Sequence, residues 1–80
     1  MTNNEIFAKV ADLLAGQLPV TADQIRLDSR LVEDLGADSA NIMILVFDME
    51  TEFDIQVDND VLASVVTVKD IVDYLEKAIG

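Results

Sequence analysis

Apolar residues recur at intervals of three and four positions in three stretches of the chain, which is the spacing of one face of an α-helix. The first stretch follows Thr2 and Glu5, which have the spacing of a capping box, so the sequence predicts a helix that begins at Thr2. Gly16 stands where a left-handed residue would end this helix, and Pro19 prevents the helix from resuming. The apolar face of the predicted helix contains Ile6, Val10, Leu13 and Leu14.

The second predicted helix runs from Ser39 to Phe53, with Asp38 or Ser39 as its N-cap. The apolar run 41–47 could also form a buried strand, but the helical period continues as far as Phe53, and this length favours a helix. At about 100° per residue, the face that points to the core carries Ile42, Leu45, Val46, Met49 and Phe53. The opposite face carries Ala40, Ile44 and Phe47, which have no place in the same core.

A last helix is predicted from Thr67 to Gly80, with Asp70 in the capping-box position. Ahead of it, Asp58 can cap a short third helix over residues 59–63. We therefore expect one all-α domain over residues 1–80, an up-and-down bundle of four helices in which three are longer and one is short.

The connection between the first two predicted helices, residues 17–38, is long for a compact domain. Apolar residues spaced along it are expected to anchor it across the core, so we expect this loop to be ordered. Thr21 and Gln24 have the spacing of a second capping box, which predicts one helical turn around residues 22–25. The expected anchors are Leu18, Val20, Ile25, Leu27, Leu31 and Leu35.

Charge and missing residue types exclude several classes of function. Five Lys and Arg against sixteen Asp and Glu give a net charge of −11, and an acidic chain without a basic stripe is a poor partner for nucleic acid. The chain has no His and no Cys, which excludes Ser-His-Asp and Cys-His catalytic sets, disulfides and the common zinc sites. No apolar run reaches the roughly 18 residues of a membrane span, and residues 2–5 lack the basic start of a signal peptide. We therefore expect a cytoplasmic monomer whose partners carry basic surfaces.

The segment 34–39, Asp-Leu-Gly-Ala-Asp-Ser, places a serine at the start of the second predicted helix, after a turn that contains a glycine. This segment resembles the phosphopantetheine attachment site of the acyl carrier proteins. The resemblance covers nearly the whole chain, because further matching segments follow in order and at the right spacing. They are Leu-Val-Glu at 31–33, Glu-Phe-Asp-Ile at 52–55, and Thr-Val-Lys-Asp at 67–70 followed by Tyr74.

The resemblance implies that Ser39 Oγ carries a 4′-phosphopantetheine arm, which a phosphopantetheinyl transferase takes from coenzyme A. The thiol of the arm would then carry an acyl group as a thioester, and Asp38 would help the transferase to dock. Helix N-termini favour phosphate groups because of their open amides and the positive end of the helix dipole, which suits this position. The plainer interpretation is that Ser39 is only an N-cap.

The resemblance also implies that the acyl chain shelters inside the bundle, between the second helix and its neighbours. Plain core packing explains each residue at the matching positions when it is taken singly. The two roles are compatible, because Met side chains repack easily and let a core open for a guest. The matching positions are Met43, Val46, Met49, Val57, Leu62 and Val65.

Residues 31–68 contain nine acidic residues and no Lys or Arg, which either keeps the protein soluble or steers the basic docking patches of acyl-processing enzymes toward the arm. In the family, leucine usually follows the serine and acidic residues face outward on the second helix. Here Ala40 follows, and Asn41 and Ile44 replace two acidic residues. This departure predicts an exposed apolar patch, which favours a dedicated partner over tolerated drift or self-association. The expected partner-binding residues are Ala40, Ile44, Phe47, Glu50 and Asp58.

Two alternatives stay open from the sequence. One is a carrier of peptidyl, polyketide or D-alanyl units with the same attachment site, and the other is an unmodified helical interaction domain. We do not expect an enzyme, because no base stands near Ser39 and no nucleotide-binding glycine motif is present. We expect no metal site either, since a calcium loop from Asp58 would have Leu62 and Ala63 where a ligand and the turn glycine belong.

Overall fold

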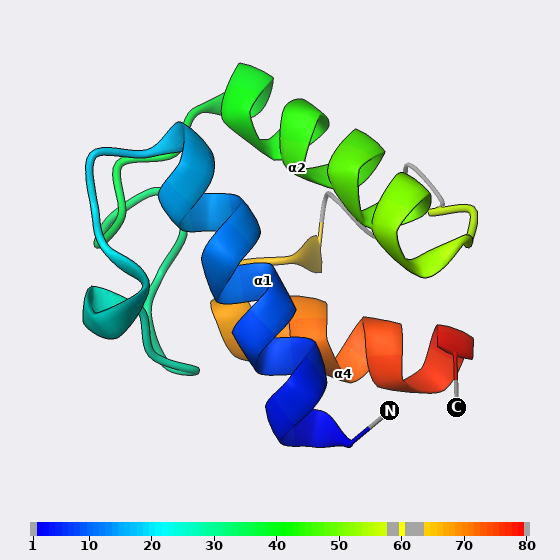
Figure 1. The fold of residues 1–80 in the computed structure, drawn as a ribbon. Helices are drawn as coiled ribbons and strands as arrows, with labels where there is room; N and C mark the ends of the chain where they lie inside the picture. Colours follow the sequence, from blue (N-terminus) through cyan, green and yellow to red (C-terminus); the bar gives the residue numbers. More distant parts are fainter. Residues whose placement is uncertain (1, 58–59, 61–63, 80) are drawn as a thin grey trace.

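The computed structural model describes residues 2–57, 60 and 64–79, and this part of the chain is all-helical, as the sequence predicts. Figure 1 shows α2 and α4 running in the same general direction, with α1 lying across both of them. The predicted short helix over residues 59–63 falls, except for residue 60, outside the described residues. The described elements are α1 (Asn3–Gln17), a 3₁₀ turn η1 (Ala22–Gln24), α2 (Ser39–Phe53) and α4 (Val68–Ile79).

The first helix begins as predicted but does not end as predicted. Thr2 Oγ1 accepts the Glu5 amide N–H at 3.2 Å, and Glu5 Oε1 accepts the Thr2 amide N–H at 3.0 Å, which completes the capping box. Gly16 is still helical and does not adopt a left-handed conformation, because α1 continues to Gln17. The chain leaves through Leu18, whose extended backbone turns its side chain into the core, so no left-handed residue is needed.

The core lies where the apolar faces of the three helices meet, and α1 packs against both α4 and α2. These are the faces that the sequence predicts, although Leu13, Ile42, Phe53 and Ile79 lie only at the edge of the core. Burying an aliphatic side chain stabilises a fold by about 1.5–3 kcal/mol, so this small core fixes how the helices pack. Its most completely buried side chains are Ile6, Val10, Leu14, Leu31, Leu45, Val68, Val72 and Leu75.

The long connection from α1 to α2 is ordered, as predicted, and it is pinned to the segment in front of α4. The Leu31 amide donates to the Val66 carbonyl and the Val68 amide donates to the Ser29 carbonyl, both at 3.0 Å, across an isolated antiparallel bridge. The prediction that the Leu27 side chain anchors the loop is wrong, because this side chain is 38% exposed. Only the Leu27 carbonyl holds the loop, by accepting the Lys69 amide N–H at 2.8 Å. Of the other expected anchors, Val20 is half-buried and the buried ones are Leu18, Ile25, Leu31 and Leu35.

Candidate functional site

A tight turn connects the bridge at Arg30 to the start of α2. The Asp34 and Leu35 amides both donate to the Arg30 carbonyl, at 2.9 and 3.1 Å, and the Ala37 amide donates to the Leu31 carbonyl at 2.9 Å. Gly36 has a φ of +73°, a conformation that an L side chain rarely adopts, so the glycine is what allows the turn to close. The buried side chains of Leu35 and Ala37 then fix the direction in which α2 begins.

Asp38, and not Ser39, caps α2. Asp38 Oδ1 accepts the Asn41 amide N–H at 2.9 Å, and Asn41 Oδ1 accepts the Asp38 amide N–H at 3.2 Å, which is a reciprocal capping box. Ser39 is therefore the first residue of the helix itself. Its side chain is exposed, and its hydroxyl makes no hydrogen bond with any other residue that the structure describes. The interpretation of Ser39 as an ordinary cap is excluded, because that task belongs to its neighbour.

The start of α2 is also tied to the end of α1. Asn41 Nδ2 donates to Gln17 Oε1 at 3.3 Å, so one side chain both closes the cap and bridges two helices. The Gln17 Nε2 group is buried and has no partner among the described residues. This contact holds the first turn of α2 in place while leaving the Ser39 side chain at the surface.

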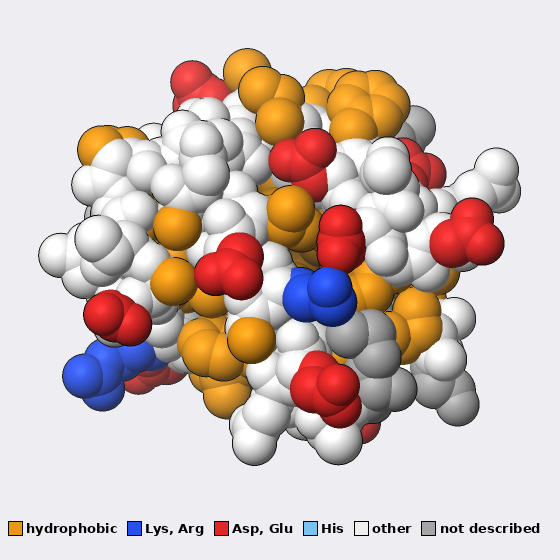
Figure 2. Space-filling model, viewed as in Figure 1, with side chains coloured by type: hydrophobic (Ala, Val, Ile, Leu, Met, Phe, Trp, Pro, Cys, Tyr) orange, Lys and Arg blue, Asp and Glu red, His pale blue; other side chains and the backbone are white. Residues whose placement is uncertain are grey.

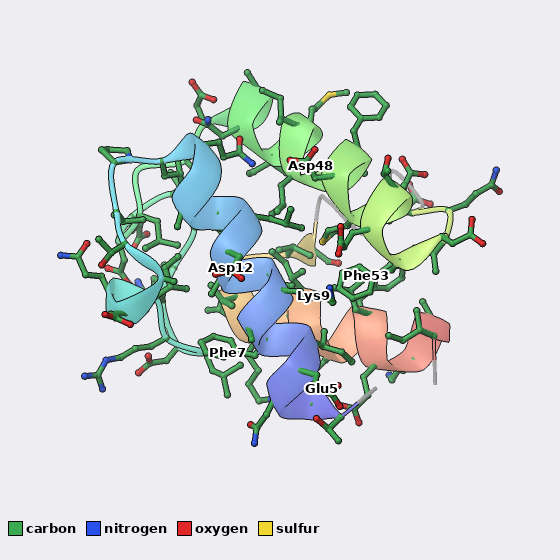
Figure 3. All side chains as sticks on the ribbon, in the orientation of Figure 1. Glu5, Phe7, Lys9, Asp12, Asp48 and Phe53 are labelled. Atoms are coloured by element: carbon green, nitrogen blue, oxygen red, sulfur yellow. The ribbon has the colours of Figure 1, made fainter. Side chains whose placement is uncertain are left out.

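Three of the five basic side chains, Lys9, Arg30 and Lys69, form ion pairs with acidic side chains other than Asp38. Lys9 Nζ lies 2.8 Å from Glu52 Oε1, and this hydrogen bond raises the pKa of the Lys9 ammonium group. Figure 3 shows Lys9 extending from α1 toward Phe53, near the far end of α2. Arg30 pairs with Glu33, and Lys69 Nζ lies 2.8 Å from Asp73 Oδ2. Exposed pairs of this kind contribute little to stability, and α2 itself contains no Lys or Arg.

A small apolar cavity of about 10 Å³ lies between α2 and α4, a volume close to that of a single water-sized sphere. Four residues that the sequence assigned to the acyl pocket line it: Val46, Met49, Val57 and Val65. The assignment of Met43 to the pocket is wrong, because its side chain lies on the surface with 52% exposure. Leu62 lies outside the described residues. The sequence interpretation missed the remaining lining residues, which are Leu31, Ile42, Leu45, Ile71 and Tyr74.

Signals for most of the missed residues were present in the sequence. Ile42 and Leu45 belong to the predicted inward face of α2, one turn before Val46 and Met49, so the same stripe that defines the core defines this wall. Tyr74 follows Ile71 by three residues and therefore shares its helix face. No local pattern places Leu31, because a long-range bridge brings its loop to the cavity.

The outward face of α2 is apolar near Ser39. Ile44 is 49% exposed and Phe47 is 62% exposed, Ala40 is exposed beside them, and Met43 joins this group. Figure 2 shows hydrophobic side chains gathered along the edge of the molecule that α2 forms. We call Ala40, Met43, Ile44 and Phe47 the outer α2 face.

One expected partner-binding residue, Glu50, does not belong to the outer α2 face. Glu50 is half-buried, and its Oε2 accepts the Val57 amide N–H at 3.2 Å. Asp58 lies outside the described residues. Within the described ranges, no group of His, Cys, Asp and Glu side chains could hold a metal ion, and no helix is both long and apolar enough to cross a membrane.

An exposed serine at a helix start and an apolar cavity inside a small helical bundle are the features that a carrier with a prosthetic arm requires. Residues 8–75 match the family described as the phosphopantetheine attachment site. The chain belongs to the acyl carrier protein family. Acyl carrier proteins carry acyl groups on 4′-phosphopantetheine and are carriers rather than catalysts.

Individual relatives match over nearly the full length. The chain is 42% identical over 79 residues to the acyl carrier protein of Thermotoga maritima, covering 99% of this chain and 98% of the relative. It is 39% identical to that of Akkermansia muciniphila over 80 residues, the full length of both chains. The solved structure of the acyl carrier protein from Enterococcus faecalis superposes with a TM-score of 0.81 at 31% identity, covering 98% of this chain and 99% of that chain.

Proposed function

We propose that Ser39 Oγ is the attachment point of the phosphopantetheine arm, and that the acyl cargo is carried on the thiol of this arm. The observation that carries the proposal is the free Ser39 hydroxyl: it is exposed at the first position of α2 while Asp38 makes the cap. A modifying enzyme needs such an accessible oxygen. The open amides of the first helical turn and the helix dipole favour the negative charge of a phosphodiester beside it.

The transfer forms one bond and breaks one. The Ser39 hydroxyl oxygen attacks the phosphorus of coenzyme A that bears the pantetheine, the bond from this phosphorus to 3′,5′-ADP breaks, and the serine proton passes to a base of the transferase. Asp38 has one oxygen committed to the Asn41 amide, while its other oxygen accepts no hydrogen bond from a described residue. This second oxygen is the one that we assign to docking of the transferase.

The test is intact-mass spectrometry after incubation with coenzyme A and a phosphopantetheinyl transferase. We expect the parent protein to gain the mass of one arm and Ser39→Ala to gain none. Thr51→Ala is the matched control, because it removes another exposed hydroxyl from the same helix and should gain the arm normally. A parent protein that never gains the arm, or a Ser39→Ala variant that still does, contradicts the proposal.

The acyl chain of the loaded protein shelters in the cavity between α2 and α4. Its lining is apolar, and Met49 supplies a side chain that adapts to a guest. Because the cavity has room for about one water-sized sphere, its walls must move outward when a chain enters. Loading with a medium-length chain should shift the methyl NMR signals of Val46, Val57 and Val65. The exposed Val32 is the control, and unchanged signals at the lining positions would place the chain outside the bundle.

The outer α2 face docks an acyl-processing enzyme that presents an apolar pocket with a basic rim. Its exposed apolar side chains lie on a helix whose flanking charges are all acidic, which complements such a rim and repels a second copy of this chain. Asp58 is assigned to the same docking surface from the sequence alone. Ile44→Glu should weaken acyl transfer to the dedicated partner and leave loading by the transferase intact. Unchanged acyl transfer, or self-association of the parent protein through this face, would contradict the assignment.

A further inference from the structure

The walls of the small apolar cavity differ in how readily they can move. Leu31, Leu45 and Ile71 are almost completely buried in the core, so displacing them would disrupt the packing of the whole bundle. Val57 is only half-buried and lies in the non-helical segment 55–57 that follows α2. Val57 forms part of an outer wall of the cavity, and its segment can swing outward at less cost than the deeply buried core residues.

Two side-chain hydrogen bonds hold this outer wall in place, one from α2 and one from α4. From α2, Glu50 Oε2 accepts the Val57 amide N–H at 3.2 Å. From α4, the Tyr74 hydroxyl donates to the Gln56 carbonyl at 3.3 Å, while the Tyr74 ring itself lines the cavity. Neighbouring residues of one short segment are thus fastened to the two helices between which the cavity lies.

We infer that Glu50 and Tyr74 are positioning residues that together latch the segment 55–57 over the cavity, and that releasing this latch lets the acyl chain leave. The inference rests on the proposed function, in which the chain is tethered at Ser39 and sheltered between α2 and α4. The latch acts through the backbone of the segment, so neither side chain needs to form a hydrogen bond with the cargo.

Glu50 also gives a docking partner a way to open the latch. Its carboxylate is half-buried, and it forms no ion pair with any residue in the described part of the chain. A cationic side chain from the basic rim of a partner would compete with the Val57 amide for this carboxylate, because hydrogen bonds between charged groups are the stronger ones. Docking on the acidic surface would then loosen the wall of the cavity at the moment when cargo must be transferred.

Amide hydrogen exchange in the unmodified protein tests the latch itself. Glu50→Ala should lower the protection of the Val57 amide by about tenfold, since a hydrogen bond to a charged group is lost. Tyr74→Phe keeps the ring and removes only the hydroxyl, and it should lower the same protection by a smaller factor. Glu52→Ala is the matched control, because it removes a carboxylate from the same helix that pairs with Lys9 instead. Unchanged Val57 protection in Glu50→Ala overturns the inference, as does an equal loss in Glu52→Ala.

Thioester cleavage in the loaded protein tests the release of cargo. Hydroxylamine attacks the thioester carbonyl, forms the hydroxamate and frees the thiol of the arm, so its rate reports how long the thioester spends outside the bundle. For a decanoyl chain, Glu50→Ala/Tyr74→Phe should react several-fold faster than the parent protein, whereas acetyl-loaded forms should react alike because an acetyl group needs no shelter. Equal decanoyl rates, or an acetyl rate raised by the same factor, overturn the inference. A parent protein that cannot be loaded at Ser39 would instead contradict the proposed function, while the exchange experiment would still decide the latch.

Discussion

Replacing Gly36 with alanine should destabilise the protein, and replacing Gly16 with alanine should stabilise it. At both positions the added Cβ would meet no atom within 4 Å, so steric crowding plays no part in either variant. What differs is the backbone: Gly36 has a φ of +73°, whereas Gly16 is an ordinary residue of α1. The two variants therefore isolate the cost of backbone conformation from every contact.

The magnitudes follow from these conformations. A left-handed residue with a side chain costs about 1–2 kcal/mol, of which about 0.5 kcal/mol is offset because alanine restricts the unfolded chain. Gly36→Ala should thus lose about 1 kcal/mol, a fall in Tm of about 4–8 °C for a domain of this size. Gly16→Ala should gain about 0.5–1 kcal/mol, the usual difference between the two residues in a helix.

Thermal and urea unfolding followed by circular dichroism measure both effects, at one fixed ionic strength because the chain carries a net charge of −11. The pair of substitutions serves as its own control. Shifts of the same sign in both variants, or a Gly36→Ala variant as stable as the parent protein, would refute the conformation assigned to the turn before Ser39.

Three further predictions concern backbone conformation and charge. Asp54 is a left-handed residue with a φ of +55° at the C-terminus of α2, where a side chain strains the backbone and a negative charge faces the negative end of the helix dipole. Asp54→Gly should therefore raise the free energy of unfolding in urea by about 1 kcal/mol, and a lower value would contradict this. Added salt should raise the Tm of the parent protein, because it screens repulsion among the acidic side chains, and a flat response would show that this repulsion is small. The Asp70 carboxylate accepts hydrogen bonds from the amides of Val66 and Thr67, and these bonds, that of Val66 most, lower the pKa of Asp70 from 3.8. The stability that this carboxylate contributes is therefore present above pH 3.8 and is lost as the pH falls through the lowered pKa. The stability difference between the parent protein and Asp70→Asn should therefore shrink below pH 3.8, and a difference that stays constant would contradict this assignment.

Local signals in the sequence predicted most of the fold. The capping boxes of Thr2 with Glu5 and of Thr67 with Asp70 bond reciprocally in the structure, and Gln24 Oε1 accepts the Thr21 amide N–H, because each bond needs only residues three positions apart. The bounds of α2 followed from an apolar stripe that continues to Phe53. The end of α1 was wrong, since Gly16 permits a left-handed conformation without requiring one, and burial of Leu18 decides how the chain leaves the helix.

In the candidate site too, the features set by helix periodicity could be predicted and those set by packing could not. The exposed position of Ser39 and the apolar outer α2 face could be predicted, because helix periodicity places both. The position of Met43 could not, because it lies between the inward and outward faces of the helix and only packing decides its side. The bonds from Glu50 to Val57 and from Tyr74 to Gln56 depend on the path of a non-helical segment, for which the sequence has no periodic signal.

The central claim is that one hydroxyl, that of Ser39, carries the arm. Tandem mass spectrometry of peptides from the protein isolated from its own cells tests it most directly, because fragment ions identify the modified residue. The account predicts phosphopantetheine, with or without an acyl group, on the peptide that contains Ser39 and at that residue. An unmodified peptide throughout, or an arm on any other side chain, would contradict it.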